Sequence, residues 1–336
     1  KLGKNVLCSE GKVQVMGEEI LEVRKKSIMV KTLGCSSTGI ECDKASVSGS
    51  VSQRACVYCG ARVVLNPITD AFHIVHGPIG CASYTWDIRG SLSSGSDWYR
   101  NSLSTDLREK DIIFGGAAKL TAAIDEVVQK YQAKLIFVYA TCIVGVIGDD
   151  VEAVGKESEV KYGIPVLTVP CYGFLDGEYY QGYFAVAEQL AERFLHKQPK
   201  VENTALLIGD NGGPWGHYAK EVKRLLAYFS IKVIGQFPGY VPINELPQIT
   251  AASFSIILGG RGQTYNGLTK IARLLEMNYE VPYLQDGYPV GWDNTVGWLR
   301  NLGVFLHQEA LAEKAVVQEM DKLFAFAGKV KKITQG

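Results

Sequence analysis

The sequence predicts an α/β protein made of doubly wound, Rossmann-like units with parallel sheets. Segments with apolar residues at helical spacing alternate with short, continuously apolar runs, which are typical of strands buried in a parallel sheet. The chain has 336 residues, 47% of them hydrophobic, which suits two such units with substantial cores. The 35 basic residues balance the 35 acidic ones, so net charge offers no attraction for nucleic acid or an anionic membrane.

The alternation of elements is clearest from Leu120 onward. A helix is expected over 119–131 and a strand over 134–140, and then a helix over 148–163 and a strand over 164–170. The polar stretch His196–Asn203 is the expected boundary before a second series. That series comprises a strand over 204–210, a helix over 215–229, strands over 231–237 and 254–260, a helix over 266–279 and a strand over 281–287.

These patterns divide the chain into three expected regions. Residues 1–50 form an irregular lead-in, 51–200 a first α/β domain, and 201–336 a second Rossmann-like domain with C-terminal helices. Apolar runs such as 135–139 are far shorter than the roughly 20 residues that cross a bilayer. The segment after Lys1 lacks the apolar core of a secretory signal. We therefore expect a cytoplasmic protein with no membrane partner.

Eight cysteines are the most informative feature of the composition. Without an export signal, thiols kept for metal binding or redox work are favoured over a disulfide framework. Cys142 follows the strand that ends at Ala140 and precedes a helix expected to begin near Asp149 and Asp150. Backbone N–H groups there can donate to a thiolate, although an inert buried thiol also fits. The polar lead-in holds three cysteines interpreted as structural or incidental: Cys8, Cys35 and Cys42.

Two further segments carry cysteines in suggestive settings. Cys81 lies in HGPIGC, where glycine and proline constrain a turn that can approach a ligand closely. Cys56 and Cys59 form a C-x-x-C pair, which fits zinc, an iron–sulfur cluster or a redox pair. His73 and His76 could also bind metal, but the apolar surroundings of His73 favour a hydrogen-bonded core residue.

Three segments together resemble a known family. They read ACVYCGARVVLNPITDAFHIVHGPIGCASYTWDIRGSLSSG, STDLREKDIIFGG and YATCIVGVIGDDVEAV. They resemble the nitrogenase component 1 superfamily and its NifD/NifE-like alpha-type subunits, most of all the alpha-type subunit of the iron–molybdenum cofactor assembly scaffold. The resemblance extends from Ser52 to Leu299.

The resemblance implies a shared iron–sulfur cluster of the 4Fe–4S type. Its ligands would be Cys56, Cys81 and Cys142, completed by a homologous beta-type (NifN/NifK-like) subunit in a heterotetramer, while Cys59 matches a position that does not bind the cluster. Thiolates are soft ligands suited to such clusters. Residues 51–200 would then be the cluster-binding domain, and an ATP-dependent iron protein (NifH-like) would donate electrons.

The resemblance also implies a cavity for a larger metallocluster precursor, beside which Arg89 would lie. Tyr179 and Tyr183 stand where the catalytic nitrogenase subunit has Gln and His, which argues against dinitrogen reduction. Gly259 and Gly260 replace the cysteine that anchors a cofactor in the family. A precursor in this cavity would therefore be held by charge and hydrogen bonds.

Two functions fit the resemblance. The first is a scaffold subunit for metallocluster assembly, and the second is the catalytic alpha-type subunit of a nitrogenase-like reductase with another substrate. A zinc-stabilised α/β protein is disfavoured by the number of matching residues. The chain stops where family members continue into a third α/β domain, so either it is trimmed or it is a compact relative with a more open cavity.

Overall fold

The computed structural model describes most of the chain beyond residue 55. The described ranges are 56–83, 101–172, 179–209, 217–239, 241–258, 263–285 and 289–334. Six of the cysteines and candidate site residues discussed above lie outside them: Cys8, Cys35, Cys42, Arg89, Gly259 and Gly260.

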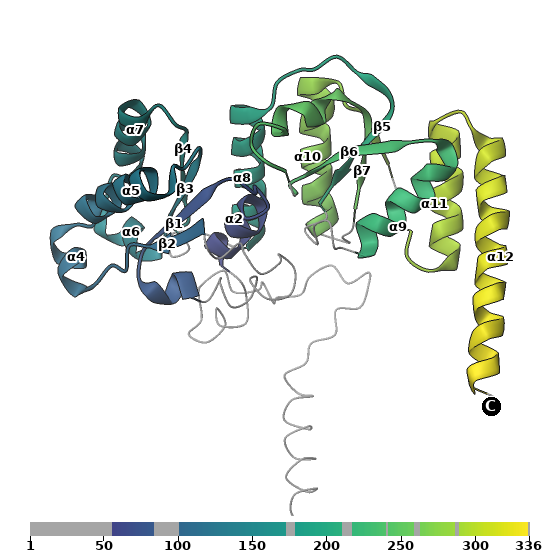
Figure 1. Ribbon diagram of the computed structural model, residues 1–336, viewed down its shortest axis with the longest axis horizontal. Helices are drawn as coiled ribbons and strands as arrows, with labels where there is room; N and C mark the ends of the chain where they lie inside the picture. Colours follow the sequence, from purple (N-terminus) through teal and green to yellow (C-terminus); the bar gives the residue numbers. More distant parts are fainter. Residues whose placement is uncertain are drawn as a thin grey trace, which may run out of the picture. The chain divides into compact units, whose positions relative to one another are not determined.

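The first sheet contains four parallel strands in the order β2-β1-β3-β4 (Figure 1). The strands are β1 (Phe72–His76), β2 (Ser102–Ser104), β3 (Ile136–Ala140) and β4 (Val166–Pro170). The helices of this half are α2 (Val57–Leu65), α4 (Glu109–Phe114), α5 (Ala117–Tyr131), α6 (Cys142–Ile147), α7 (Val151–Tyr162) and α8 (Tyr179–Phe194). Parallel order with helical crossovers confirms the predicted α/β class.

Helices cover both faces of β3, which explains why the sequence of this strand is apolar throughout. Every residue of β3 is buried, and successive side chains point to opposite faces of the sheet. Ile136 and Val138 pack into the core with α5 and α7, whereas Phe137 and Tyr139 pack into the core with α2 and α8. Because both faces are covered, no polar alternation appears in the strand.

The second sheet also has four parallel strands, in the order β6-β5-β7-β8. They are β5 (Val201–Ile208), β6 (Lys232–Phe237), β7 (Ala252–Ile257) and β8 (Tyr283–Leu284). The accompanying helices are α9 (His217–Leu226), α10 (Gln263–Tyr279), α11 (Trp292–Phe305) and α12 (Glu309–Thr334), with the 3-10 turns η4 (Ala227–Phe229) and η5 (Leu246–Ala251). Both predicted series of strands and helices are therefore present.

One hydrophobic core joins residues from both sheets. It includes Phe137 of β3 and Leu206 of β5, together with side chains of α2, α8 and α10. The Tyr279 hydroxyl on α10 also donates to the Ala191 carbonyl of α8 over 3.1 Å. The segment between α8 and β5, residues 195–200, overlaps only the first part of the predicted boundary, since β5 begins at Val201, and the division into domains at residue 200 stays a prediction. No helix in the described ranges is both long and apolar enough to cross a membrane.

The segment after β3 differs from its prediction. The sequence suggested a loop from Thr141 to Gly148, whereas the structure contains the six-residue helix α6. This helix is too short and too uniformly apolar to show a helical period. The next helix begins as predicted, because the Asp150 side chain accepts the Ala153 N–H over 2.9 Å as the N-cap of α7.

Candidate metal centre

Three cysteines follow the carboxyl ends of neighbouring strands in the first sheet. Cys81 lies in the helical residues 79–83 after β1, Cys142 is the first residue of α6 after β3, and Cys171 directly follows β4. Parallel strands direct their carboxyl ends to one edge, where ligands of open α/β sheets bind. The topology therefore brings together thiols that are far apart in the sequence.

A close contact between two loops fixes Cys81 relative to Cys142. The Thr141 backbone N–H and hydroxyl both donate to the His76 carbonyl, over 3.1 and 3.0 Å. Gly77 lies so close to the Thr141 side chain that a β-carbon at Gly77 would overlap it. The Thr141 side chain also hydrogen-bonds Cys81. These contacts link the loop after β1 to the loop after β3.

Cys56 reaches the same neighbourhood from a helix rather than a strand. It is the N-cap residue of α2, which crosses α8 with backbone-to-backbone contact. A β-carbon on Gly60 would overlap the Tyr179 carbonyl, and one on Gly182 would overlap the Val57 carbonyl. Glycine at both positions lets the helices approach this closely. The crossing thereby fixes the start of α2 against the core.

The start of α2 favours the thiolate form of Cys56. The Cys59 sulfur lies 3.7 Å from the Cys56 sulfur, and hydrogen bonds from Cys59 and from the backbone N–H groups of Cys56, Tyr58 and Cys59 lower the pKa of Cys56 to about 6. Burial opposes this shift in the pKa. The thiolate is the form of cysteine that binds metal.

The pKa values of Cys81 and Cys171 depend on burial and on the neighbouring cysteine sulfurs. Burial raises the pKa of Cys81, and the nearby sulfurs of Cys142 and Cys56 raise it further. Cys171 is fully buried; burial raises its pKa well above the usual value, with smaller contributions from Cys56 and Cys142. The structure therefore brings the three predicted ligands into one neighbourhood and adds Cys171 at its buried side.

The three predicted ligands offer thiol sulfurs, the soft donors that suit iron–sulfur clusters. Cys56, Cys81 and Cys142 are partly buried, and none of them forms a disulfide. Within the described ranges, no three His, Cys, Asp or Glu side chains lie close enough to bind one ion.

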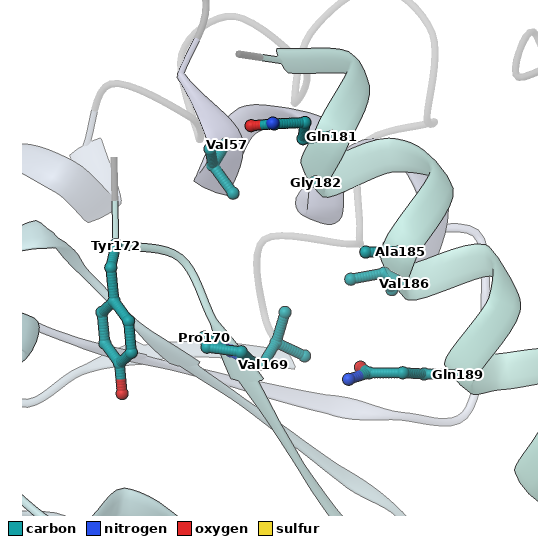
Figure 2. Close-up of a pocket in the computed structure, with 9 residues that line it drawn as sticks. All are labelled: Val57, Val169, Pro170, Tyr172, Gln181, Gly182, Ala185, Val186 and Gln189. Atoms are coloured by element: carbon teal, nitrogen blue, oxygen red, sulfur yellow. The ribbon is translucent and has the colours of Figure 1, made fainter. Parts of the chain in front are cut away.

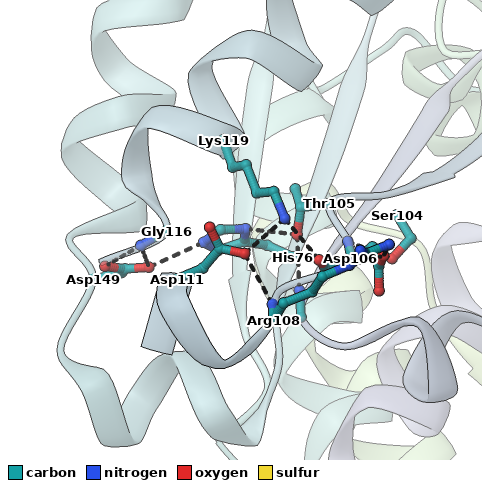
Figure 3. A network of polar contacts seen from close by, with 10 residues as sticks. His76, Ser104, Thr105, Asp106, Arg108, Asp111, Gly116, Lys119 and Asp149 are labelled. Carbon is teal, nitrogen blue, oxygen red and sulfur yellow. Dashed lines mark hydrogen bonds and ion pairs between the residues drawn. The ribbon is translucent and has the colours of Figure 1, made fainter. Parts of the chain in front are cut away.

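A polar network joins His76, Thr105, Gly116 and Asp149 (Figure 3). The ring of His76 interacts through Nδ1 with the Thr105 hydroxyl at 3.1 Å and through Nε2 with Asp149 at 3.3 Å. Asp149 also accepts the Gly116 N–H over 2.8 Å at the start of α5. Burial lowers the pKa of His76, against the opposing effect of Asp149. His76 therefore braces the loops through hydrogen bonds to protein.

His73, the other histidine considered as a metal ligand, is a core residue, as the sequence suggested. His73 is 2% exposed, and its Nδ1 lies 2.8 Å from the Tyr139 hydroxyl.

Arg62 on α2, which sequence reasoning missed, is 3% exposed and lies over the Tyr139 ring at 5.4 Å. Arg62 hydrogen-bonds Ser102, but its Nη1 atom has no hydrogen-bond partner among the described residues. In the sequence, the one sign of this buried charge was a basic residue within the apolar run of α2.

The two tyrosines predicted to line a cofactor cavity lie on the first turns of α8. Their ring centroids are 6.3 Å apart; Tyr183 is buried in the shared core and Tyr179 packs against it. The predicted roles of Tyr179 and Tyr183 stay predictions.

A separate cavity of about 330 Å³ lies between the end of β4 and α8 (Figure 2). It is lined by Val57, Val169, Pro170, Tyr172, Gln181, Gly182, Ala185, Val186 and Gln189. The lining is mainly apolar, and the buried Gln189 side-chain oxygen has no hydrogen-bond partner in the part of the chain that the structure describes. Neither Tyr179 nor Tyr183 lines this cavity. The lining does include Val57 and Tyr172, which are the chain neighbours of Cys56 and Cys171.

Comparisons with known proteins agree with the resemblance seen in the motifs. The chain is 45% identical over 322 residues to the nitrogenase iron-molybdenum cofactor biosynthesis protein NifE of Clostridium pasteurianum, covering 93% of this chain and 68% of that protein. It is 36% identical over 335 residues to NifE of Methanosarcina barkeri, covering 95% and 70%. The nitrogenase molybdenum-iron protein alpha chain of Methanosarcina barkeri is 32% identical over 314 residues, covering 90% and 57%.

A solved structure and a family profile complete the comparison. The structure titled "Nitrogenase Cp1 at pH 5" superposes with a TM-score of 0.74 and 27% identity, covering 91% of this chain. This chain spans 63% of the length of that one. The profile described as "Nitrogenase component 1 type Oxidoreductase" matches residues 56–336. The chain therefore belongs to the nitrogenase component 1 family.

Proposed function

We propose that this protein is an alpha-type scaffold subunit on which a nitrogenase metallocluster of the FeMo-cofactor type is assembled. The observation that carries the proposal is the convergence of Cys56, Cys81 and Cys142 at one edge of the first sheet. The high identity to proteins named for iron-molybdenum cofactor biosynthesis supports the scaffold role over other roles in the family.

In this proposal the three cysteines hold a 4Fe–4S-type cluster together with a homologous beta-type subunit. Three thiolates from this chain leave one iron of a four-iron cluster to be bound from elsewhere, and in this proposal the beta-type subunit supplies that ligand within a heterotetramer. When bound, the cluster supplies reversible one-electron transfer. The chain's own residues hold the site together: Thr141 ties the two ligand loops, and the N–H groups at the start of α2 favour the Cys56 thiolate.

An apolar surface beside the ligand loops supports docking of an electron donor. On α4, Ile113 is 73% exposed and Phe114 is 85% exposed, and on α6 Val146 is 63% exposed. Exposed apolar side chains grouped on adjacent helices mark interaction surfaces. We assign this surface, Ile113, Phe114 and Val146, to an ATP-dependent iron protein (NifH-like) that delivers electrons to the cluster.

The cargo would occupy a second site next to α8. Its proposed lining is Arg89, Tyr179, Tyr183, Gly259 and Gly260, of which the two tyrosines are on α8. A site without a cysteine would hold a metallocluster precursor by charge and hydrogen bonds, which suits cargo that must be released. Arg89→Ala should therefore lower occupancy of this second site and leave the interface cluster in place.

The test is anaerobic co-purification with the beta-type subunit, followed by metal analysis and electron paramagnetic resonance spectroscopy. Cys56→Ala, Cys81→Ala and Cys142→Ala should each lose iron and the cluster signal, whereas the control Cys171→Ala should keep them. Full iron retention in Cys142→Ala would overturn the ligand assignment. Molybdenum, vanadium or an iron-rich precursor in the isolated protein supports the scaffold. A single four-iron cluster with substrate turnover would instead identify a reductase, as the similarity to a molybdenum-iron alpha chain allows.

A further inference from the structure

Cys56 and Cys59 are arranged as a dithiol at the first turn of α2. Their sulfur atoms lie 3.7 Å apart. Cys56 is the N-cap residue and is partly exposed, whereas Cys59 is 8% exposed within the helix. Redox-active C-x-x-C motifs share this geometry of an accessible first cysteine at a helix start and a shielded second cysteine.

We propose that Cys56 and Cys59 form a reversible disulfide in the chain before a cluster is loaded, and that this disulfide blocks loading. The disulfide itself stands on the geometry of α2. The blocking effect also rests on the proposed function, in which Cys56 is a cluster ligand. A sulfur that is bonded to Cys59 cannot bind iron, so the two states exclude each other.

The reaction needs an oxidant, and a small-molecule disulfide of the glutathione class supplies it. The Cys56 sulfur, as the accessible one, attacks this disulfide, forms a mixed disulfide and releases one small thiol. The Cys59 sulfur then attacks the Cys56 sulfur and releases the second small thiol. Two electrons and two protons pass from the cysteine pair to the oxidant, which becomes two thiols. Excess small thiol reverses both steps.

The structure favours Cys59 over the other cysteines as the partner of Cys56. Both residues lie on one helical turn, so forming the bond, about 2 Å long, needs side-chain rotation and little backbone movement. Cys81 and Cys142 lie on separate loops that the Thr141 contacts hold in place. Cys171 is fully buried, which shields it from the oxidant.

The disulfide can be read from one peptide. Trypsin cleaves after Arg54 and Arg62, so residues 55–62 (ACVYCGAR) carry both cysteines and no other. The full-length chain without cluster is reduced, treated anaerobically with oxidised glutathione, and trapped with N-ethylmaleimide before mass spectrometry. We expect this peptide to lose two hydrogens and to carry no maleimide, and to regain two maleimides after reduction. A peptide that stays doubly labelled, or is joined to another cysteine, overturns the proposal.

The blocking effect is measured by iron uptake during reconstitution with iron and sulfide. Oxidised wild-type chain should take up several-fold less iron than reduced chain, with no glutathione left on residues 55–62. In Cys59→Ser and Cys59→Ala the mixed disulfide on Cys56 cannot be resolved, so after the same oxidation this peptide should retain one glutathione instead. Cys171→Ser is the matched control and should respond as wild type does. Equal uptake by oxidised and reduced wild type, with the disulfide present, overturns the block. If reduced wild type takes up no iron, the proposed function fails, while the peptide result still decides whether the disulfide forms.

Discussion

Gly182 on α8 lies against the backbone carbonyl of Val57 on α2, with no space for a β-carbon between them. On the same crossing, Gly60 lies equally close to the Tyr179 carbonyl. The residue that precedes Val57 is Cys56, so the position of a proposed cluster ligand depends on how closely two helix backbones approach. A side chain at either glycine would push the start of α2 away from the core.

The first prediction concerns this helix crossing. Gly182→Ala should lower the free energy of unfolding by about 1–3 kcal/mol, because the new methyl group meets backbone atoms that cannot rotate away. This cost outweighs the roughly 1 kcal/mol that alanine contributes within a helix. Urea denaturation measures the change. Gly297→Ala on α11 is the control and should raise stability, because no atom of the described residues lies within 4 Å of an added β-carbon there. Equal effects of the two changes would contradict a tight crossing.

The second prediction concerns the link between the ligand loops. Gly77→Ala should separate the loops that carry Cys81 and Cys142, since its methyl group overlaps Thr141. We expect reduced iron content in the purified complex, measured by colorimetric iron analysis, along with lower stability. At the nearby Gly80, no atom of the described residues lies within 4 Å of an added β-carbon, so Gly80→Ala should retain iron. Full iron retention in Gly77→Ala would show that the loops adjust independently.

The third prediction concerns pH and follows from His73. Burial, and then Arg62, lower the pKa of His73 well below its usual value, so the unfolded chain binds a proton that the folded chain does not. The free energy of unfolding should therefore fall as the pH drops below about 6.5, with a slope from this group of at most about 1.4 kcal/mol per pH unit. His73→Gln should show a shallower slope between pH 7 and 5 in urea titrations. An unchanged slope would contradict the assignment.

The fourth prediction concerns the attachment of α12. Hydrogen bonds from Arg224, and then from Tyr228 and Lys322, lower the pKa of Glu319 to about 2, against the effect of burial. The lowered pKa contributes stability above the usual value of 4.5, which is lost as the pH falls toward 2. Glu319→Gln should therefore be less stable than wild type at pH 7, and the difference should shrink below pH 4.5. Thermal unfolding at several pH values tests this, and a constant difference would contradict it.

The fifth prediction concerns the apolar surface of α4. Phe114→Ser should slow electron delivery from the iron protein and leave the iron content unchanged, because the side chain is 85% exposed and outside the core. Stopped-flow absorbance measures the transfer rate. Val160→Ser on α7 changes an equally exposed side chain, 87% exposed, and should transfer at the wild-type rate. Identical rates in all three proteins would remove α4 from the docking surface.

The sequence alone determined the class of fold and the identity of several local features. The continuous apolar run of β3 indicated a strand covered on both faces, because a parallel sheet under helices leaves no polar side. Asp150 marked the start of α7, since a carboxylate satisfies N–H groups that the first helical turn leaves unbonded. The motifs around Cys56, Cys81 and Cys142 indicated the family that the comparisons then confirmed.

The tertiary structure decided how these features meet. The sequence did not reveal that α6 is a helix, because six apolar residues show no period. Nor did it reveal that Gly77 meets Thr141 or that Gly182 meets Val57, since each contact joins segments far apart in the chain. The short distance between the sulfur atoms of Cys56 and Cys59 also depends on where α2 begins, which only the structure shows. Periodicity reports which face of an element is buried, whereas the contact across that face depends on packing between elements, and only the folded chain determines it.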